Sequence, residues 1–466
     1  MVGLIFTNKP MKTKLSFAAL AALSLGTLCL AQTNPPSSPT PPPPAPAPAD
    51  DWKPISYVAP GQQYPQLNSE KRAKFRIEAP TATEVAVSLG RPLTVTKGED
   101  GVWTVITSPL VEGFHYYQII VDGARAADPN TRTFFGSSRW MSGIDVPSDD
   151  QDFFATKDVP HGVVREQTYF STVTKQWRRC FIYTPPDYDT NQSARYPVLY
   201  LQHGAGEDET AWSVQGRAGF ILDNLIAEGK SNPMLIVMDN GGGSGLFGAP
   251  RGNRPGGPAG NSLVAPNATA AAPNAPATAA PAATIAGAAP SPAPSAPNAT
   301  APGAGPGGPG ARGPGSGRPP FNFSEFENIL LKDIIPTIDA KYRTLADREH
   351  RGMAGLSMGG MQTRNVGFGH LEVFSHIGIF SGGTLGDPKA ENSPLANADE
   401  FNRRVKVAFI SYGEAEGGSK TLKEYCDSLT SAGLKNIHYY ISPGTAHEFL
   451  SWRRSLHEFA PLLFRD

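Results

Sequence analysis

Ser357 lies at the centre of Gly355-Leu-Ser-Met-Gly359, the only G-x-S-x-G segment of the chain. A short strand-like run at 351–354 precedes this segment, and residues 361–366 after it can begin a helix. In such a strand–turn–helix the small residues permit a sharp turn, which exposes the serine hydroxyl beside the helix N-terminus. The alternative is a glycine-rich structural turn. The context favours Ser357 as the nucleophile of an acyl transfer.

A nucleophilic serine needs a base, and the chain has nine histidines. In hydrolases with this motif the acid and then the histidine follow the serine along the chain. Only His438, His447 and His457 lie beyond the strand that is predicted to end near Ser411. His438 is within a strand-like run and His457 within a helical tail, whereas His447 is in a loop after a Pro-Gly pair. We therefore expect His447 to be the base.

The acid is expected just after the strand predicted at 405–411. Glu414 and Glu416 follow that strand directly, and Asp427 lies in the helix expected next. A carboxylate here would orient the histidine and stabilise its imidazolium, and Glu can do this as well as Asp. Either glutamate could instead be a solvated surface charge, so the residues alone leave the choice open.

The oxyanion of a tetrahedral intermediate needs backbone N–H donors that are already in place. The amide of Met358, directly after the serine, is one expected donor, and the loop His203-Gly-Ala-Gly206 is expected to supply the second. The chain has no H-E-x-x-H, Walker or dinucleotide-binding segment, and its three cysteines are too few for a disulfide scaffold. We expect no metal and no cofactor.

The elements that must position these residues alternate between strands and helices from about residue 163 onward. Residues 326–338 carry apolar side chains at helical spacing, and buried-strand runs are predicted at 196–202, 234–238, 405–411 and 437–441. Strand–helix alternation predicts an α/β domain at 151–466, with a mainly parallel sheet that is covered on both faces.

Residues 57–150 show short alternating segments separated by turns, which predict a small all-β sandwich. Strands are expected at 74–77, 85–87, 102–106 and 116–121. The aromatic side chains of this region could line a sugar-binding face, but core packing is the simpler interpretation for most of them. These side chains are Trp103, Tyr116, Tyr117 and Trp140, of which Trp140 is the candidate exception because it follows the last clear strand.

Two tracts hold much of the 49 Gly and 45 Pro in the 466-residue chain. The tract at 32–56 is Pro-rich and predicts an extended linker. The tract at about 250–320 has almost no bulky aliphatic side chains, so it cannot bury enough apolar surface to offset the entropy of ordering. We expect a disordered insertion within the α/β domain.

Residues 1–31 have the pattern of a secretory signal peptide, with Lys12 and Lys14 before an apolar run and cleavage expected after Ala31. A membrane anchor is the alternative, but the run is short and lacks a stop-transfer flank. The net charge is −1 and the chain has no basic run, so the sequence does not indicate a nucleic-acid-binding surface. We expect a secreted or periplasmic protein without a membrane span, in which a disulfide between Cys180 and Cys426 is an open question.

Four segments resemble the putative-esterase group, which includes carbohydrate esterase family one (feruloyl and acetyl xylan esterases) and the enterochelin esterases. They are WRRCFIYTPP (177–186), LQHGAGEDETAW (201–212), ADREHRGMAGLSMGG (346–360) and GTAHEFLSWRRSLHEF (444–459). The resemblance implies an α/β-hydrolase fold. Residues 57–150 resemble the immunoglobulin-like early-set domain that precedes many of these esterases, whereas the long insertion is not a family feature.

Carried over residue by residue, the resemblance implies Ser357 as nucleophile, His447 as base, and Ala205 and Met358 as oxyanion donors. The family's acid is Asp in the pattern G-x-x-D, which aligns with Gly-Glu-Ala-Glu at 413–416. The resemblance therefore selects Glu416, with Glu in place of the usual Asp.

The resemblance implies an exported serine esterase that acts on esters carried by plant polysaccharide or its oligomers. An enterochelin-like esterase that cleaves a siderophore lactone is a second interpretation, because that group also has an N-terminal β-domain. A carbohydrate-binding surface protein with a degenerate hydrolase fold is a third, and the intact Ser357 and His447 argue against it.

Overall fold

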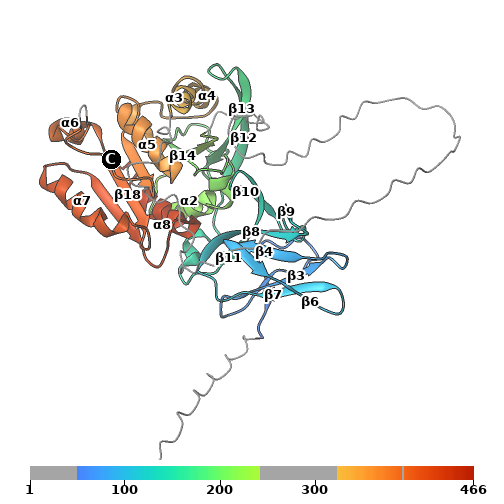
Figure 1. Ribbon diagram of the computed structural model, residues 1–466. Helices are drawn as coiled ribbons and strands as arrows, with labels where there is room; N and C mark the ends of the chain where they lie inside the picture. The colour runs from blue at the N-terminus through green and yellow to red at the C-terminus, as the bar shows by residue number, and fades with distance from the viewer. Residues whose placement is uncertain (1–49, 242–322, 391–392, 466) are drawn as a thin grey trace, which may run out of the picture. The chain divides into compact units, whose positions relative to one another are not determined.

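The computed structural model describes residues 50–241, 323–390 and 393–465 (Figure 1). The signal peptide predicted at 1–31, most of the linker predicted at 32–56 and the insertion predicted at about 250–320 lie outside these residues.

Two antiparallel sheets form the N-terminal part of the described chain. The order of the first is β1 Lys53–Pro54, β2 Gln66–Leu67, β3 Ala73–Glu78, β7 Val102–Ile106 and β6 Thr96–Lys97. The order of the second is β10 Thr133–Gly136, β11 Arg139–Val146, β8 Gly113–Val121, β4 Val85–Leu89 and β5 Arg91–Thr94, with β9 Ala124–Ala126 paired to β8. Phe75 and Trp103 of the first sheet share a core with Tyr117 and Ile144 of the second. The two sheets therefore pack face to face as predicted, and their immunoglobulin-like character stays a prediction.

The first sheet begins before the boundary that was predicted at residue 57. Lys53–Pro54 pair with Gln66–Leu67, and Ile55 is buried in the core of the two sheets. Composition had assigned these residues to the linker because of the nearby prolines. A single proline is compatible with a strand at the edge of a sheet, where no amide hydrogen bond is required of it.

One eight-stranded sheet underlies the C-terminal part (Figure 1). Its order is β12 Val163–Ser171, β13 Gln176–Thr184, β15 Leu235–Asp239, β14 Val198–Gln202, β16 Arg351–Leu356, β17 His376–Phe380, β18 Val407–Gly413 and β19 Ile437–Ser442. The pairings of β12 with β13 and of β13 with β15 are antiparallel, and every pairing from β15 to β19 is parallel. The mainly parallel sheet predicted from the strand–helix alternation is confirmed.

Helices cover both faces of this sheet. Alternate residues of β14 contact different layers, with Leu199 and Leu201 in one core and Val198 and Tyr200 in the other. The first layer consists of α1 Ala211–Val214, α2 Ala218–Ala227 and α8 Phe449–Phe459. The second consists of α3 Ser324–Ile329, a π-helical turn Leu330–Ile334, α4 Ile335–Lys341, α5 Met358–Gly369, α6 Ala398–Arg404 and α7 Ser419–Ser431. Short 3-10 turns complete the described elements at Gln151–Phe154, Arg348–His350 and Ala460–Leu462.

The core beneath α8 includes residues from the all-β region. Phe114 of β8 and Phe134 of β10 belong to the same buried cluster as Phe449, and the rings of Phe114 and Phe449 meet edge to face with centroids 5.8 Å apart. The described residues from 50 to 465 belong to one compact unit. The all-β region therefore has a core of its own and in addition contributes side chains to the core beneath α8.

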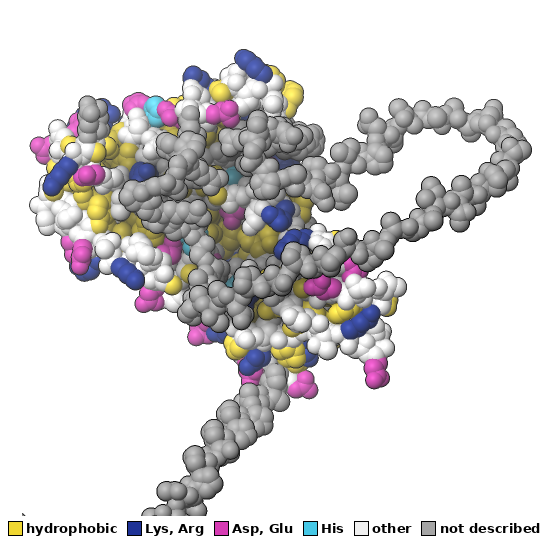
Figure 2. Space-filling view, viewed as in Figure 1, with side chains coloured by type: hydrophobic (Ala, Val, Ile, Leu, Met, Phe, Trp, Pro, Cys, Tyr) yellow, Lys and Arg dark blue, Asp and Glu magenta, His cyan; other side chains and the backbone are white. Residues whose placement is uncertain are grey.

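Several individual predictions can be compared with burial. Trp103 and Tyr117 are core residues. Trp140, the candidate exception to core packing among these aromatic side chains, is 58% exposed. Cys180 and Cys426 are buried, free and in different core clusters, which answers the open question about a disulfide between them. No helix in the described ranges is both long and apolar enough to cross a bilayer. On the face seen in Figure 2, basic and acidic side chains are interspersed.

Candidate active site

Ser357 occupies a sharp turn between β16 and α5. Its backbone has φ 53° and ψ −114°, a strained conformation that non-glycine residues rarely adopt. Its amide donates to the Phe380 carbonyl of the neighbouring strand over 2.7 Å. A Cβ at Gly359 would lie 2.6 Å from the carbonyl oxygens of Gln202 and His203, so α5 can approach β14 this closely only with glycine there. The predicted strand–turn–helix is present, with Ser357 at its tip.

A chain of hydrogen-bonded side chains joins Ser357, His447 and Glu416. The Nε2 atom of His447 lies 2.9 Å from Ser357 Oγ, and its Nδ1 atom lies 2.8 Å from Glu416 Oε2. Because a carboxylate only accepts hydrogen bonds, Nδ1 carries the ring proton, and Nε2 of the neutral imidazole accepts from the serine hydroxyl. In this tautomer Nε2 is the atom that can remove the hydroxyl proton.

Several donors hold the Glu416 carboxylate in its charged form. Burial raises the pKa of Glu416, but hydrogen bonds from His447, Ser381 and Gly413 outweigh burial and bring the pKa below its usual value. Ser381 Oγ donates to Oε1 over 2.6 Å, and the Gly413 amide donates to the same oxygen over 2.8 Å. One carboxylate oxygen is therefore fixed while the other contacts His447.

Two joined loops bring His447 and Glu416 together. β18 and β19 are adjacent parallel strands, so the loops that follow them leave the same edge of the sheet. The Ala415 amide of the first loop donates to the Thr445 carbonyl of the second over 2.9 Å. This bond explains how residues 31 positions apart keep a fixed distance.

The other predicted candidates lie outside this chain of side chains. Glu414 Oε2 accepts from the exposed Gly444 amide over 2.8 Å, which ties the two loops together at the surface. Asp427 forms an ion pair with a lysine one turn away on the exposed side of α7. His438 and His457 lie in β19 and α8, in the strand and the helix that the sequence predicts.

The amide of Met358 is the first in α5, where helical amides have no acceptor within the helix. The loop after β14 runs beside it, since a Cβ at Gly204 would lie 3.5 Å from Ser357 Cβ. The Gly204 amide itself donates to the Glu207 carboxylate over 2.9 Å. Ala205 is exposed, and in the described part of the chain its amide has no hydrogen-bond partner. The loop next to the serine therefore offers an uncommitted N–H at the predicted position.

The family model described as "Putative esterase" matches residues 171–261 and 319–464, just over half of the chain. The chain belongs to this esterase family. The matched ranges contain Ser357, Glu416 and His447.

Two curated relatives are similar to this esterase. The endo-1,4-β-xylanase/feruloyl esterase of Xylanibacter ruminicola is 37% identical over 430 residues, which cover 89% of this chain and 48% of the relative. The endo-1,4-β-xylanase Y of Acetivibrio thermocellus is 22% identical over 312 residues, which cover 61% of this chain and 22% of the relative. The chain spans about half the length of the first relative and about a fifth of the second.

A solved structure shares the fold of this esterase. The enterobactin esterase of Shigella flexneri, crystallised in the presence of enterobactin, has a TM-score of 0.50 at 14% identity, covering 84% of this chain and 92% of that chain. At this identity the likeness concerns the fold alone.

Two residues of the esterase site were not predicted. Ser381 lies directly after β17, with φ 51°, and donates to Glu416. Trp452 of α8 donates from Nε1 to Ser381 Oγ over 3.0 Å, and its ring meets the ring of His447 edge to face with centroids 5.1 Å apart. The position of Ser381 after a parallel strand, at the same sheet edge as Ser357, is a signal that could have identified it. A tryptophan within a helix carries no such signal.

The all-β region supports the loop that contains Ala205. The Ser138 amide, in the β10–β11 turn, donates to the Gly206 carbonyl over 2.7 Å. Gly206 has φ +83°, and a Cβ there would lie 3.0 Å from Ser137 Cα, so the close approach requires glycine. Glu207 of the same loop accepts from the Gly204 amide, and burial raises the pKa of Glu207 to about 7.

A cavity of about 710 Å³ opens beside His447. The esterase part of the chain contributes Glu207 and the segment from His447 to Trp452. The all-β region contributes the rest of the lining, from the end of β4 to Leu93 of β5, the 107–111 segment, the beginning of β8 and Ser137. In the described ranges no group of three or more His, Cys, Asp or Glu side chains is arranged to hold a metal ion.

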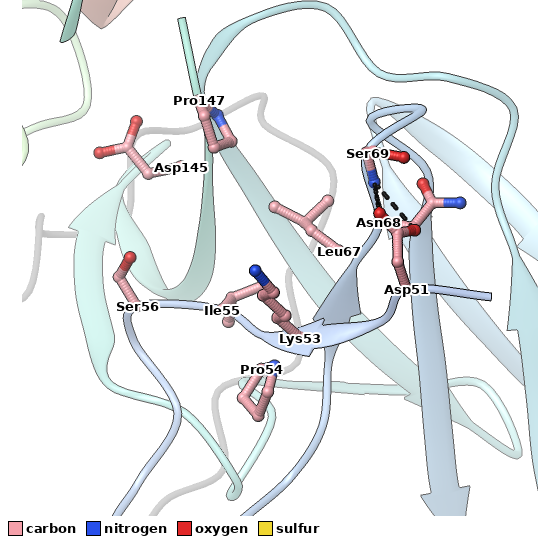
Figure 3. Close-up of a pocket in the computed structure, with 10 residues that line it drawn as sticks. All are labelled: Asp51, Lys53, Pro54, Ile55, Ser56, Leu67, Asn68, Ser69, Asp145 and Pro147. Atoms are coloured by element: carbon pink, nitrogen blue, oxygen red, sulfur yellow. Dashed lines mark hydrogen bonds between the residues drawn. The ribbon is translucent and has the colours of Figure 1, made fainter. Parts of the chain in front are cut away.

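A second hollow, of about 340 Å³, lies in the all-β region (Figure 3). Asp51 accepts two hydrogen bonds from the Ser69 amide at one side of it, and Asp145 and Pro147 lie at the other. None of the predicted site residues lines this hollow, so it is separate from the esterase site.

Proposed function

We propose that the protein is a serine esterase that hydrolyses carboxylic esters carried by plant polysaccharide or its oligosaccharides, with feruloyl or acetyl groups as the acyl part. The observation that carries this proposal is the hydrogen-bonded chain Glu416–His447–Ser357, in which the serine lies on a strained turn at the beginning of a helix.

In the proposed mechanism, Ser357 Oγ attacks the ester carbonyl while His447 Nε2 accepts its proton. Glu416 stabilises the imidazolium that forms, and the amides of Met358 and Ala205 stabilise the oxyanion. His447 then donates its proton to the departing alkoxide and leaves an acyl group on the serine. A water molecule repeats the sequence on the acyl-enzyme, which releases the acid and restores the serine hydroxyl.

The relatives support a polysaccharide ester as the substrate. Both curated relatives are named as xylanases, and the more similar one is also named as a feruloyl esterase. The likeness to the enterobactin esterase concerns the fold and does not favour a siderophore lactone.

We also propose that the chain is exported to the periplasm or beyond, because Lys12, Lys14 and the apolar run that follows have the pattern of a signal peptide. N-terminal sequencing of the protein recovered outside the cytoplasm tests this, and a first residue at Gln32 is expected.

The decisive experiment compares wild type with Ser357→Ala on p-nitrophenyl acetate. We expect the variant to lose several orders of magnitude in kcat, because triad residues act as a unit, while its Tm changes little. A variant that keeps more than about a tenth of the activity would exclude Ser357 as nucleophile. No activity in the wild type would favour the degenerate binding protein.

A substrate panel then separates the esterase alternatives. Methyl ferulate, acetylated xylan and a siderophore trilactone are offered at equal concentration, and kcat/KM is measured for each. The proposal requires one of the first two to be preferred. A preference for the trilactone would replace the polysaccharide ester with a siderophore.

A further inference from the structure

The cavity beside His447 reaches the proposed base without including the nucleophile. His447, Glu448 and Trp452 line it, whereas Ser357 is not among its lining residues. During acylation His447 Nε2 donates its proton to the departing alkoxide, so the alcohol part of the ester must lie against the imidazole ring. The cavity is therefore in the position of the alcohol and not of the acyl group.

The lining from the all-β region combines apolar surface with hydrogen-bonding groups. Leu93 and Val111 supply the apolar surface, and Val111 is 61% exposed. Arg91, the first residue of β5, is exposed and has five N–H donors. His115 Nε2 lies 2.6 Å from the Val111 carbonyl oxygen, which can only accept, so Nε2 carries the proton and Nδ1 remains an acceptor.

We propose that this cavity is the subsite for the sugar that carries the ester, and that the all-β region is one wall of the esterase site. The inference rests on the proposed function, because it assigns the alcohol part of the same substrate. A sugar presents C–H faces to Leu93 and Val111 and hydroxyl groups to Arg91 and His115. The volume of about 710 Å³ lies within the range of about 300–1,000 Å³ that is typical of ligand sites.

The test compares two esters of one acid, the methyl ester and the arabinose ester, with wild type and Arg91→Ala. Because the two substrates differ only in the alcohol, the ratio of their kcat/KM values measures recognition of the sugar. We expect Arg91→Ala to lower this ratio, arabinose ester over methyl ester, about tenfold, the effect of losing one hydrogen bond to a charged donor. Arg125→Ala is the matched control, since Arg125 is an exposed arginine of the same region that does not line the cavity.

A second measurement uses the reverse of the acylation step. The methyl ester acylates Ser357, and added arabinose competes with water for the acyl group. A sugar hydroxyl attacks the acyl carbonyl and gives its proton to His447, which returns it to Ser357 Oγ as the acyl–serine bond breaks. A sugar subsite predicts transfer to arabinose in the wild type and in Arg125→Ala, and a severalfold loss of transfer in Arg91→Ala.

The outcomes separate this inference from the proposed function. A wild type that hydrolyses neither ester contradicts the proposed function. A wild type that hydrolyses both, with an ester ratio and a transfer yield that Arg91→Ala leaves unchanged, overturns the sugar subsite while the esterase remains. A lower ester ratio together with a lower transfer yield in Arg91→Ala supports both the proposed function and the sugar subsite.

Discussion

Arg453 of α8 holds Asp145 of β11 with two parallel hydrogen bonds, from Nη1 to Oδ1 and from Nη2 to Oδ2, each 3.0 Å long. The arginine side chain is fully buried and also donates to the Gln215 carbonyl. The Tyr57 hydroxyl donates to the same carboxylate over 3.2 Å. The last long helix is therefore fastened to the all-β region by a buried, hydrogen-bonded ion pair.

Removing one partner of this pair should destabilise the protein strongly. Arg453→Ala removes a fully buried side chain and leaves the Asp145 carboxylate, which is only 13% exposed, without its counter-charge, so we expect the free energy of unfolding to fall by about 3–5 kcal/mol. Arg454→Ala is the matched control on the same helix, because its partner Asp150 is 48% exposed and such pairs contribute about 0.2–1 kcal/mol. Urea denaturation of both variants measures the difference, and equal losses would contradict a special role for Arg453.

The identity of the acid can be tested with two isosteric variants. Glu416→Gln removes the charge that stabilises the His447 imidazolium and should cost roughly 10⁴ in kcat. Glu414→Gln changes a surface carboxylate whose contact is the Gly444 amide, so kcat should stay close to that of the wild type. Both are assayed on one activated ester. If Glu414→Gln were the variant with the large loss of kcat, the assignment of Glu416 as the acid would be wrong.

The raised pKa of Glu207 predicts a pH-dependent stability. Burial brings this pKa to about 7, above the value in the unfolded chain, so the folded state binds the proton more tightly. The corresponding stability is complete below the unfolded pKa and is lost as the pH rises through about 7. Glu207→Gln keeps an acceptor for the Gly204 amide but does not ionise. We expect the difference in Tm, wild type minus Glu207→Gln, to decrease as the pH is raised from 5 to 8.

Glu448 does not interfere with this measurement. Its pKa is also raised to about 7 by burial, but it is present in both proteins, so the difference in Tm isolates Glu207. A difference that stays constant from pH 5 to pH 8 would show that Glu207 does not titrate in this range.

The sequence predicted those parts of the site that depend on local patterns. The turn at Ser357 requires small neighbours, and these are visible as glycines two residues away on each side. His447 and the two candidate glutamates, Glu414 and Glu416, follow predicted strands at the same sheet edge, and the family resemblance was needed to select Glu416. Core packing was the simpler interpretation for most aromatic side chains of the all-β region, and Trp103 and Tyr117 are indeed buried.

Contacts between segments that lie far apart along the chain could not be predicted from the sequence. Phe114 lies just before the strand predicted at 116–121, and nothing in the sequence around it indicates that its neighbour is Phe449 of α8. The bond from Ser138 to Gly206 joins a hairpin turn to a loop 68 positions away, with no residue pattern that specifies the pairing. The cavity beside His447 is lined by residues of both regions, and no residue pattern predicts that they share it.

Asp145 and Arg453 are 308 positions apart, so the ribosome synthesises Asp145 long before α8. The all-β region emerges first, and the parts of its Phe114 and Asp145 side chains that contact α8 stay uncovered until α8 has been translated. Closing so long a loop is entropically costly and slow, and exposed apolar surface favours aggregation meanwhile. A nascent chain that stalls before residue 449 therefore carries an unburied apolar face, and degradation or chaperone capture is its expected fate.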